Sequence, residues 1–143
     1  MTDTGAKIAC LQTCELFADL DPSTVGVLAE AMEAESYRQG DEVCEFGEPA
    51  DCVWVIMEGE LGVYLPDVPA PVRRMTPGQI LGEYGMFGGT RTTTVRAEAG
   101  AVLLTVDYER FRSFLSQYPQ ALYKLLEVAV ERLEQAEAKL RAR

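Results

Sequence analysis

The chain has 143 residues, and its 23 acidic against 13 basic side chains give a formal net charge of −10. It contains no histidine, which excludes catalytic triads, helical zinc sites and general bases that depend on an imidazole. An acidic protein repels a polyanion at long range, so we expect no nucleic-acid partner. At this length, one compact domain over residues 1–143 is predicted, with no catalytic residues and no enzymatic activity.

No segment of the sequence has the character of a membrane anchor. The longest apolar runs are Cys52–Met57 and Ala101–Leu104, whereas a spanning helix needs roughly 18 or more apolar residues. The start, Met-Thr-Asp-Thr-Gly, lacks the basic and apolar regions of a signal peptide. We therefore predict a cytoplasmic protein that has no membrane partner.

Four cysteines leave two alternatives open: Cys10, Cys14, Cys44 and Cys52. Four thiolates are enough to hold an iron–sulfur cluster, which would make the chain a redox sensor. However, no two of them form a Cys-x-x-Cys pair, and two fall in a predicted helix and two in predicted strands. Buried thiols that pack as small hydrophobic groups are favoured, and no metal site is predicted.

Helices are predicted in the first quarter of the chain, from about residue 7 to residue 34. Asp21 and Pro22 indicate a helix start, because aspartate caps a first turn and proline fits the first helical position. The apolar residues that follow recur at helical spacing: Val25, Leu28, Ala29 and Met32. This pattern predicts a helix from about residue 22 to residue 34.

From Glu35 to about residue 106 the apolar period changes to two, and Gly and Pro interrupt the chain often, which is typical of short strands. Residues 53–57 alternate in this way, and the alternation continues after Gly59 in residues 61–65, so a hairpin is predicted there. Further strands are predicted at residues 72–75, 92–97 and 101–106. Seven or eight strands, with turn signals about every 8–12 residues, predict a β-sandwich or a jelly roll.

Two helices are predicted between residues 107 and 141. Asp107 is the predicted N-cap of the first, which ends before Pro119, where a longer helix begins. The apolar positions of the longer helix form a heptad seam: Leu122, Leu126, Ala129, Leu133, Ala136 and Leu140. Because the strands can cover only part of so long a helix, we expect the last three of these residues to be exposed. The seam favours a parallel homodimer, and the alternative is a lid over the chain's own ligand site.

The segment of residues 77–97, PGQILGEYGMFGGTRTTTVRA, combines residue types that suit an anion site. Gly82 and Gly85 let the backbone approach a ligand closely and present N–H groups to it. Arg91 can hold a phosphate by two parallel hydrogen bonds, and Glu83 can accept one from a sugar hydroxyl. The pair therefore suits a phosphorylated sugar with a free hydroxyl. Alternatively, the glycines only form turns, and Glu83 and Arg91 are a surface ion pair.

This segment resembles the phosphate-binding cassette of the cyclic nucleotide-binding domain family, which includes catabolite activators and protein kinase A regulatory subunits. The resemblance extends from about residue 16 to residue 140, and its motifs occur in the family's order: Leu16-Phe17, Gly40-Asp41, the strand and turn at 53–59, Pro77-Gly78 and Arg91-Thr-Thr-Thr-Val. It implies an α+β, mainly β fold, namely an eight-stranded antiparallel jelly-roll β-roll with N-terminal helices and a long C-terminal helix. It also implies a sensor or regulatory module that binds cyclic AMP or cyclic GMP, needs no other cofactor, and signals through that helix.

The same resemblance implies roles for particular residues. Glu83 would bind the ribose 2′-hydroxyl, Arg91 the cyclic phosphate, and Thr92 either the phosphate or the base. The other ligand-binding residues that it implies are Gly82, Tyr84, Gly85 and Thr93 in the cassette, and Val63 and Val72 in an apolar pocket wall.

Two departures from the family's pattern fall inside the cassette. The interval from Gly82 to Arg91 is one residue shorter than in the commonest version, so the turn at Gly88 and Gly89 must be tight for Arg91 to reach a phosphate. Tyr84 replaces the usual aliphatic residue, and its ring would either stack near the ligand or occlude the pocket.

Other departures concern the C-terminal helix. Ala136 and Glu137 stand where bacterial activators of the family place base-contacting hydroxyls, so we expect both nucleotides to bind, with cyclic AMP favoured. The sequence ends at Arg143, directly after the helix, so no helix-turn-helix domain is expected in it, and the chain is either a stand-alone sensor or an excised piece of a larger protein. The alternative function is a dimeric interaction protein with a degenerate, empty pocket and an unidentified protein partner.

Overall fold

The structure is a computed structural model that describes residues 3–142, so residues 1–2 and 143 of the predicted domain lie outside the described part. Its helices are α1 (Thr4–Gln12), α2 (Pro22–Ala31), α3 (Gly85–Gly88), α4 (Tyr108–Gln117) and α5 (Pro119–Arg141). Its strands are β1 (Glu33–Tyr37), β2 (Glu42–Cys44), β3 (Cys52–Glu58), β4 (Leu61–Tyr64), β5 (Arg73–Met75), β6 (Ile80–Leu81), β7 (Thr94–Ala97) and β8 (Ala101–Asp107).

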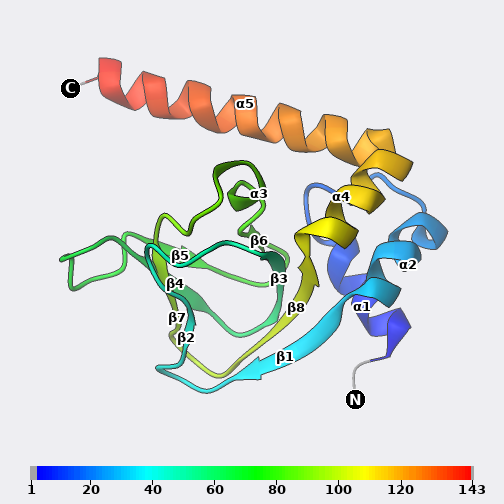
Figure 1. Ribbon diagram of the computed structural model, residues 1–143, viewed down its shortest axis with the longest axis horizontal. Helices are drawn as coiled ribbons and strands as arrows, with labels where there is room; N and C mark the ends of the chain where they lie inside the picture. The colour runs from blue at the N-terminus through cyan, green and yellow to red at the C-terminus, as the bar shows by residue number, and fades with distance from the viewer. Residues whose placement is uncertain (1–2, 143) are drawn as a thin grey trace.

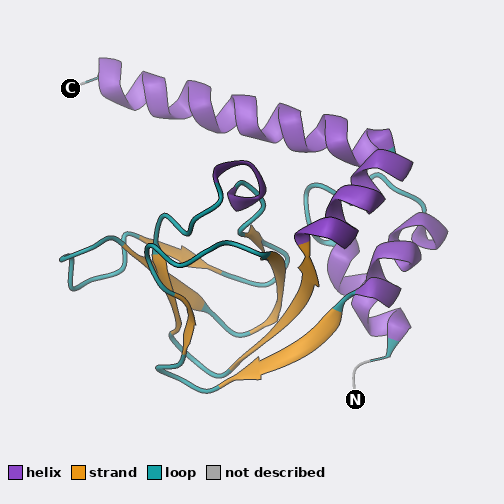
Figure 2. Ribbon diagram, viewed as in Figure 1, coloured by secondary structure: helices purple, strands orange, loops and turns teal. Residues whose placement is uncertain are grey.

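The eight strands form two four-stranded antiparallel sheets, which confirms the predicted β-roll. Strand order is β1-β8-β3-β6 in one sheet and β2-β7-β4-β5 in the other. In Figure 1, α1, α2 and α4 gather at one end of the roll, and α5 runs from that end across the top of α3. Figure 2 shows the same division, with the strands on one side of the molecule and most helices on the other.

The predicted hairpin between residues 53–57 and 61–65 is wrong. β3 lies between β8 and β6 in the first sheet, whereas β4 lies between β7 and β5 in the second. The turn at Gly59 therefore carries the chain from one sheet to the other. The alternating side chains of β3 do not indicate a hairpin, because both faces of this strand are buried.

Each face of β3 belongs to a separate hydrophobic core. Val53 and Val55 pack in the core that β3 and β8 share with the helices. Trp54 and Ile56 point the other way, into the core inside the roll. The roll is thus joined to the helices on one side of β3 and keeps its own interior on the other.

The helix predicted for residues 22–34 begins at Pro22, as expected, but ends at Ala31. Met32 is already extended, with φ −91° and ψ 143°, and Glu33 pairs with Thr105 of β8. Met32 is nevertheless fully buried, so it continues the apolar period of α2 although it is no longer helical. Strand pairing with β8 sets the end of this helix, and a helical period does not reveal it.

Two faces of α5 meet different surroundings. Its inner face, Ala121, Leu125, Val128 and Arg132, turns toward the domain, and the first three of these residues are buried. Residues of the predicted seam face solvent instead: Leu133 is 59% exposed and Leu140 64%. Ala136 is exposed as well, which confirms the expected exposure of the end of the seam. No helix within residues 3–142 is long and apolar enough to cross a membrane.

Candidate functional site

The cassette of residues 82–91 connects β6 to β7 and contains the single turn of helix α3. This turn ends at Gly89, which has a positive φ of 82° and donates its N–H to the Gly85 carbonyl. Arg91 follows two residues later, with its N–H bonded to the Glu48 carbonyl at 2.8 Å. The left-handed glycine makes the short turn that the cassette's length requires.

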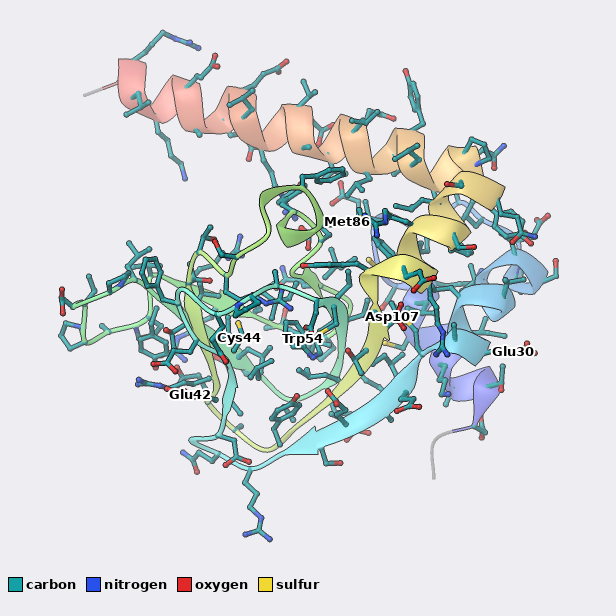
Figure 3. The ribbon with its side chains drawn as sticks, viewed as in Figure 1. Glu30, Glu42, Cys44, Trp54, Met86 and Asp107 are labelled. Carbon is teal, nitrogen blue, oxygen red and sulfur yellow. The ribbon has the colours of Figure 1, made fainter. Side chains whose placement is uncertain are left out.

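A cavity of about 290 Å³ lies between this cassette and the roll. Most of the predicted site residues line it: Val63, Gly82, Glu83, Tyr84, Gly85, Arg91, Thr92 and Thr93. The cassette also contributes Gly88 and Thr90, and other elements contribute Cys44, Trp54, Arg73, Ile80, Leu81 and Arg132. Figure 3 shows Cys44 and Trp54 inside the roll, below the α3 turn that contains Met86.

Val72 does not line this cavity. Its side chain is 52% exposed, and its N–H bonds the Val63 carbonyl at 2.8 Å at the entrance to β5. Val72 lies in a bend just before β5 begins at Arg73, and the pocket-wall role expected of it does not hold for this cavity.

The Arg91 guanidinium is buried, with only 7% of the residue exposed. Its Nη2 donates to the Cys52 carbonyl at 2.9 Å, and its Nη1 donates to the Tyr108 hydroxyl at 3.1 Å. The exposed Asp51 carboxylate lies 3.7 Å from Nη2. Nη2 also lies 3.5 Å from the Cys52 Sγ.

Two aromatic rings flank the same guanidinium. Its Cζ lies 4.5 Å from the ring centroid of Trp54 and 5.9 Å from that of Tyr108. A cation over an aromatic face is attracted by the ring's quadrupole, more so where water is excluded. Burial raises the pKa of Tyr108 above its ordinary value, although the charge of Arg91 opposes the shift. The phenol therefore stays protonated.

Glu83 is the other buried charged residue of the cassette, with 3% of the residue exposed. Its Oε1 accepts a hydrogen bond from Nη1 of Arg132, on the inner face of α5, at 3.1 Å. Its Oε2 is buried and has no hydrogen-bond partner within the described residues. Burial raises the pKa of Glu83, and the nearby Arg132 and Arg73 charges oppose this shift.

The interpretation of Glu83 and Arg91 as a surface ion pair is wrong. Both residues are buried, and each has a different partner of opposite charge: Arg132 for Glu83 and Asp51 for Arg91. Gly82 also does more than form a turn. A Cβ there would lie 2.7 Å from Nη1 of Arg91, at a φ of 87°, so only glycine allows Arg91 this position.

Tyr84 contacts α5. Its ring centroid lies 5.6 Å from the Arg132 guanidinium carbon, and its hydroxyl accepts from Nη1 of Arg132 at 3.4 Å. The same arginine therefore contacts both Glu83 and Tyr84. Through these contacts α5 is attached to the cassette.

The cysteines are not gathered into one site. Within residues 3–142 no group of three or more potential metal ligands occurs, and all four thiols are free. Burial raises the pKa of each thiol, to about 12 for Cys14 and about 11 for Cys52. Protonated, dispersed thiols do not suit an iron–sulfur cluster.

Three residues that the sequence did not indicate contribute to the site: Trp54, Tyr108 and Arg132. For Arg132 a signal exists, because it continues the spacing of Ala121, Leu125 and Val128 and so ends the inner face of α5. The sequence gives no comparable signal for Tyr108, which meets a cassette residue 26 positions earlier.

Comparisons with known proteins agree with this geometry. Residues 34–118 match the cyclic nucleotide-binding domain family. Among curated relatives, a cyclic nucleotide-gated potassium channel of Mesorhizobium japonicum is 30% identical over 118 residues, which are 82% of this chain and 32% of the channel. A CRP-like cAMP-activated global transcriptional regulator of Mycobacterium tuberculosis is 26% identical over 82% of this chain and 54% of the regulator. The chain thus spans about a third and about half of these relatives.

Solved structures share the fold. The catabolite activator protein of Thermus thermophilus superposes with a TM-score of 0.82 at 20% identity, over 89% of this chain and 62% of that one. The N-terminal domain of a transcriptional regulator from Streptomyces coelicolor gives a TM-score of 0.73 at 26% identity, over 94% and 95% of the two chains. Because the family match covers more than half of its residues, the chain belongs to the cyclic nucleotide-binding domain family.

Proposed function

We propose that the chain is a sensor or regulatory module that binds cyclic AMP or cyclic GMP and transmits ligand occupancy through α5. One observation supports this most strongly. In the cavity that contains Arg91, the Glu83 carboxylate is hydrogen-bonded to α5 through one oxygen, and its other oxygen is buried without a partner among residues 3–142. A ribose 2′-hydroxyl would donate to that free oxygen, and the cyclic phosphate would lie at Arg91.

The link to α5 follows from charge. An ionised Glu83 repels a phosphate in the same cavity, and Arg132 offsets that repulsion when it is bonded to Glu83. A nucleotide would therefore bind more tightly to the conformer in which α5 is attached to the cassette. Such a difference in affinity is what allows a ligand to shift a conformational equilibrium.

The ligand class rests on the same groups. Arg91 and the unpartnered Glu83 oxygen suit a phosphate and a hydroxyl held in one molecule, and the two relatives above are named for cyclic nucleotide or cAMP regulation. Thr92 lines the cavity, and its hydroxyl can donate to a ligand or accept from the exocyclic amine of guanine. We therefore expect both nucleotides to bind, with cyclic AMP favoured.

Calorimetric titration with each nucleotide tests the ligand, and hydrogen exchange of the α5 amides tests transmission. We expect binding in the micromolar range and slower exchange along α5 when ligand is bound. Arg132→Ala should abolish this protection, whereas Arg141→Ala, in the last turn of the same helix, should retain it. Absence of heat with both nucleotides would contradict the proposed function.

A specific observation favours the alternative of a dimeric interaction protein with an empty pocket. The Nη groups of Arg91 already bond the Cys52 carbonyl and the Tyr108 hydroxyl, while the α5 seam is exposed. In that case the same titrations would show no binding, and the chain would self-associate regardless of nucleotide.

A further inference from the structure

Tyr108 is the first residue of α4, directly after the N-cap Asp107. Figure 3 labels Asp107 at this junction, where β8 ends and α4 begins. The tyrosine is buried, and its ring belongs to the core that includes the helices. Its hydroxyl nevertheless reaches the cassette from an element that lies outside it.

The hydroxyl joins the two ends of the cassette. It donates to the Gly82 carbonyl at 2.6 Å and accepts from Nη1 of Arg91 at 3.1 Å. The direction of both bonds is fixed, because a guanidinium only donates and a carbonyl only accepts. The Tyr108 hydroxyl therefore links the Gly82 carbonyl to the Arg91 guanidinium, as donor in the first bond and acceptor in the second.

The backbone of the cassette is shaped around this contact. A Cβ on Gly85 would collide with the Tyr108 hydroxyl, and a Cβ on Gly82 would collide with Nη1 of Arg91. These glycines therefore accommodate the chain's own Arg91 and Tyr108, in addition to any ligand.

We propose that Tyr108 is a positioning residue of the phosphate site, whose hydroxyl holds Arg91 and Gly82 in one arrangement and attaches both to the start of α4. This inference rests on the proposed function, in which Arg91 binds phosphate. Without the hydroxyl, Arg91 keeps the Cys52 carbonyl and the Trp54 ring as partners, so the fold remains but the guanidinium is no longer fixed at Gly82.

Tyr108→Phe tests this directly, because it removes the hydroxyl and keeps the buried ring. We expect cyclic AMP to bind roughly tenfold to 150-fold more weakly, as for the loss of one hydrogen bond to a charged group. Tyr118→Phe is the matched control, since the Tyr118 hydroxyl makes no hydrogen bond within the described residues. Its affinity should stay within about twofold of wild type. Equal affinities for Tyr108→Phe and wild type would overturn the proposal.

A second comparison separates positioning from a general loss of stability. In an Arg91→Lys background, the additional effect of Tyr108→Phe on affinity should fall below about twofold, because the two residues act as one unit. The same loss in both backgrounds would show that Tyr108 acts on affinity without Arg91, and would overturn the proposal.

Hydrogen exchange without ligand provides a readout that does not depend on nucleotide binding. Amides of residues 82–91 should exchange faster in Tyr108→Phe than in Tyr118→Phe. If wild type binds no nucleotide, the proposed function fails, and this exchange alone decides whether Tyr108 holds the cassette. Unchanged exchange in Tyr108→Phe would overturn that role.

Discussion

Arg91 differs from a surface arginine in that its guanidinium is desolvated before any ligand arrives. It stacks on Trp54 and bonds Cys52 and Tyr108, so its orientation is fixed in advance and little side-chain entropy remains to be lost on binding. A phosphate would meet a preformed cationic surface. Removal of the Arg91 side chain should therefore greatly weaken ligand binding and leave the fold intact.

We predict that Arg91→Ala weakens binding of cyclic AMP by roughly 30-fold to several-thousand-fold, as when one member of a desolvated charge pair is removed. Calorimetry measures the loss, and circular dichroism checks that the variant folds. Arg96→Ala is a suitable control, because Arg96 is an exposed residue of β7 that pairs with Glu42. An Arg91→Ala variant that binds like wild type would show that this arginine does not meet the phosphate.

The unpartnered oxygen of Glu83 provides a second test at this scale. Glu83→Ala and a 2′-deoxy nucleotide should each weaken binding, but together they should weaken it by less than the product of the two factors. The reason is that both changes remove the same hydrogen bond. Full additivity of the two effects, measured as ratios of dissociation constants, would mean that the carboxylate and the hydroxyl never meet.

The raised pKa of Glu83 predicts a pH dependence of stability. Because burial favours the protonated form in the folded state, folding takes up a proton at pH values between the unfolded and the folded pKa. The free energy of unfolding contributed by Glu83 therefore falls as pH rises through the raised pKa. Relative to Glu83→Gln, the wild type should gain stability as pH is lowered from neutral in urea titrations. A difference that is constant with pH would contradict the assignment.

At the scale of elements, local signals located three helix starts but not that of α1, which begins at Thr4 and not at about residue 7. Pro22, Asp107 and Pro119 mark helix starts because capping and proline geometry are local. Ala31 ends α2 only because Glu33 pairs with β8, and β3 and β4 belong to different sheets because each finds partners far away in the sequence. Long-range pairing is not encoded in the period of a single segment.

In the candidate site too, local features could be predicted from the sequence and long-range contacts could not. Its cassette is continuous in sequence, so Gly82, Glu83 and Arg91 could be recognised from residue types and spacing. The contacts from α4 and α5 could not, because helical periodicity does not say which face of a helix meets which loop. Helical spacing could place Arg132 on the inner face of α5, but its contact with Glu83 and the contact of Tyr108 with Gly82 required the structure.

Because α5 has two separate faces, it can lie over the ligand site with one face and pair with a second copy of the chain through the other. Arg132 on the inner face contacts the cassette, while the seam lies about one residue, or 100°, further around the helix. Because so regular an apolar seam is exposed to solvent in the single chain, the parallel homodimer expected from the sequence stays a prediction that can be tested.

We predict that the Leu133→Glu/Leu140→Glu double variant converts a wild-type dimer to a monomer in sedimentation experiments. Both leucines are exposed in the single chain, so the fold should persist and the effect should be confined to association. Gln135→Glu adds charge beside the seam and should leave the dimer intact. A wild type that remains monomeric at high micromolar concentration would contradict the dimer.

Over the whole molecule, acidic and basic side chains are unevenly distributed, and this distribution explains how an acidic protein would hold an anion. Residues 1–60 contain 14 acidic and 2 basic side chains, whereas the cavity is lined by Arg73, Arg91 and Arg132 and by one acidic residue, Glu83. Repulsion at long range is thus replaced by attraction at the buried Arg91, where solvent screens charge less.

The proposed function requires a cyclic nucleotide to bind at Arg91, and Trp54 provides a reporter at that position. It is the only tryptophan of the chain, and its ring lies 4.5 Å from the Arg91 guanidinium carbon. Titration with cyclic AMP should change its fluorescence saturably at micromolar ligand, with one nucleotide per chain, and Arg91→Ala should lose the response. Emission that stays constant up to about 1 mM of cyclic AMP and of cyclic GMP would contradict nucleotide binding at Arg91, because binding weaker than this is worth less than about 4 kcal/mol.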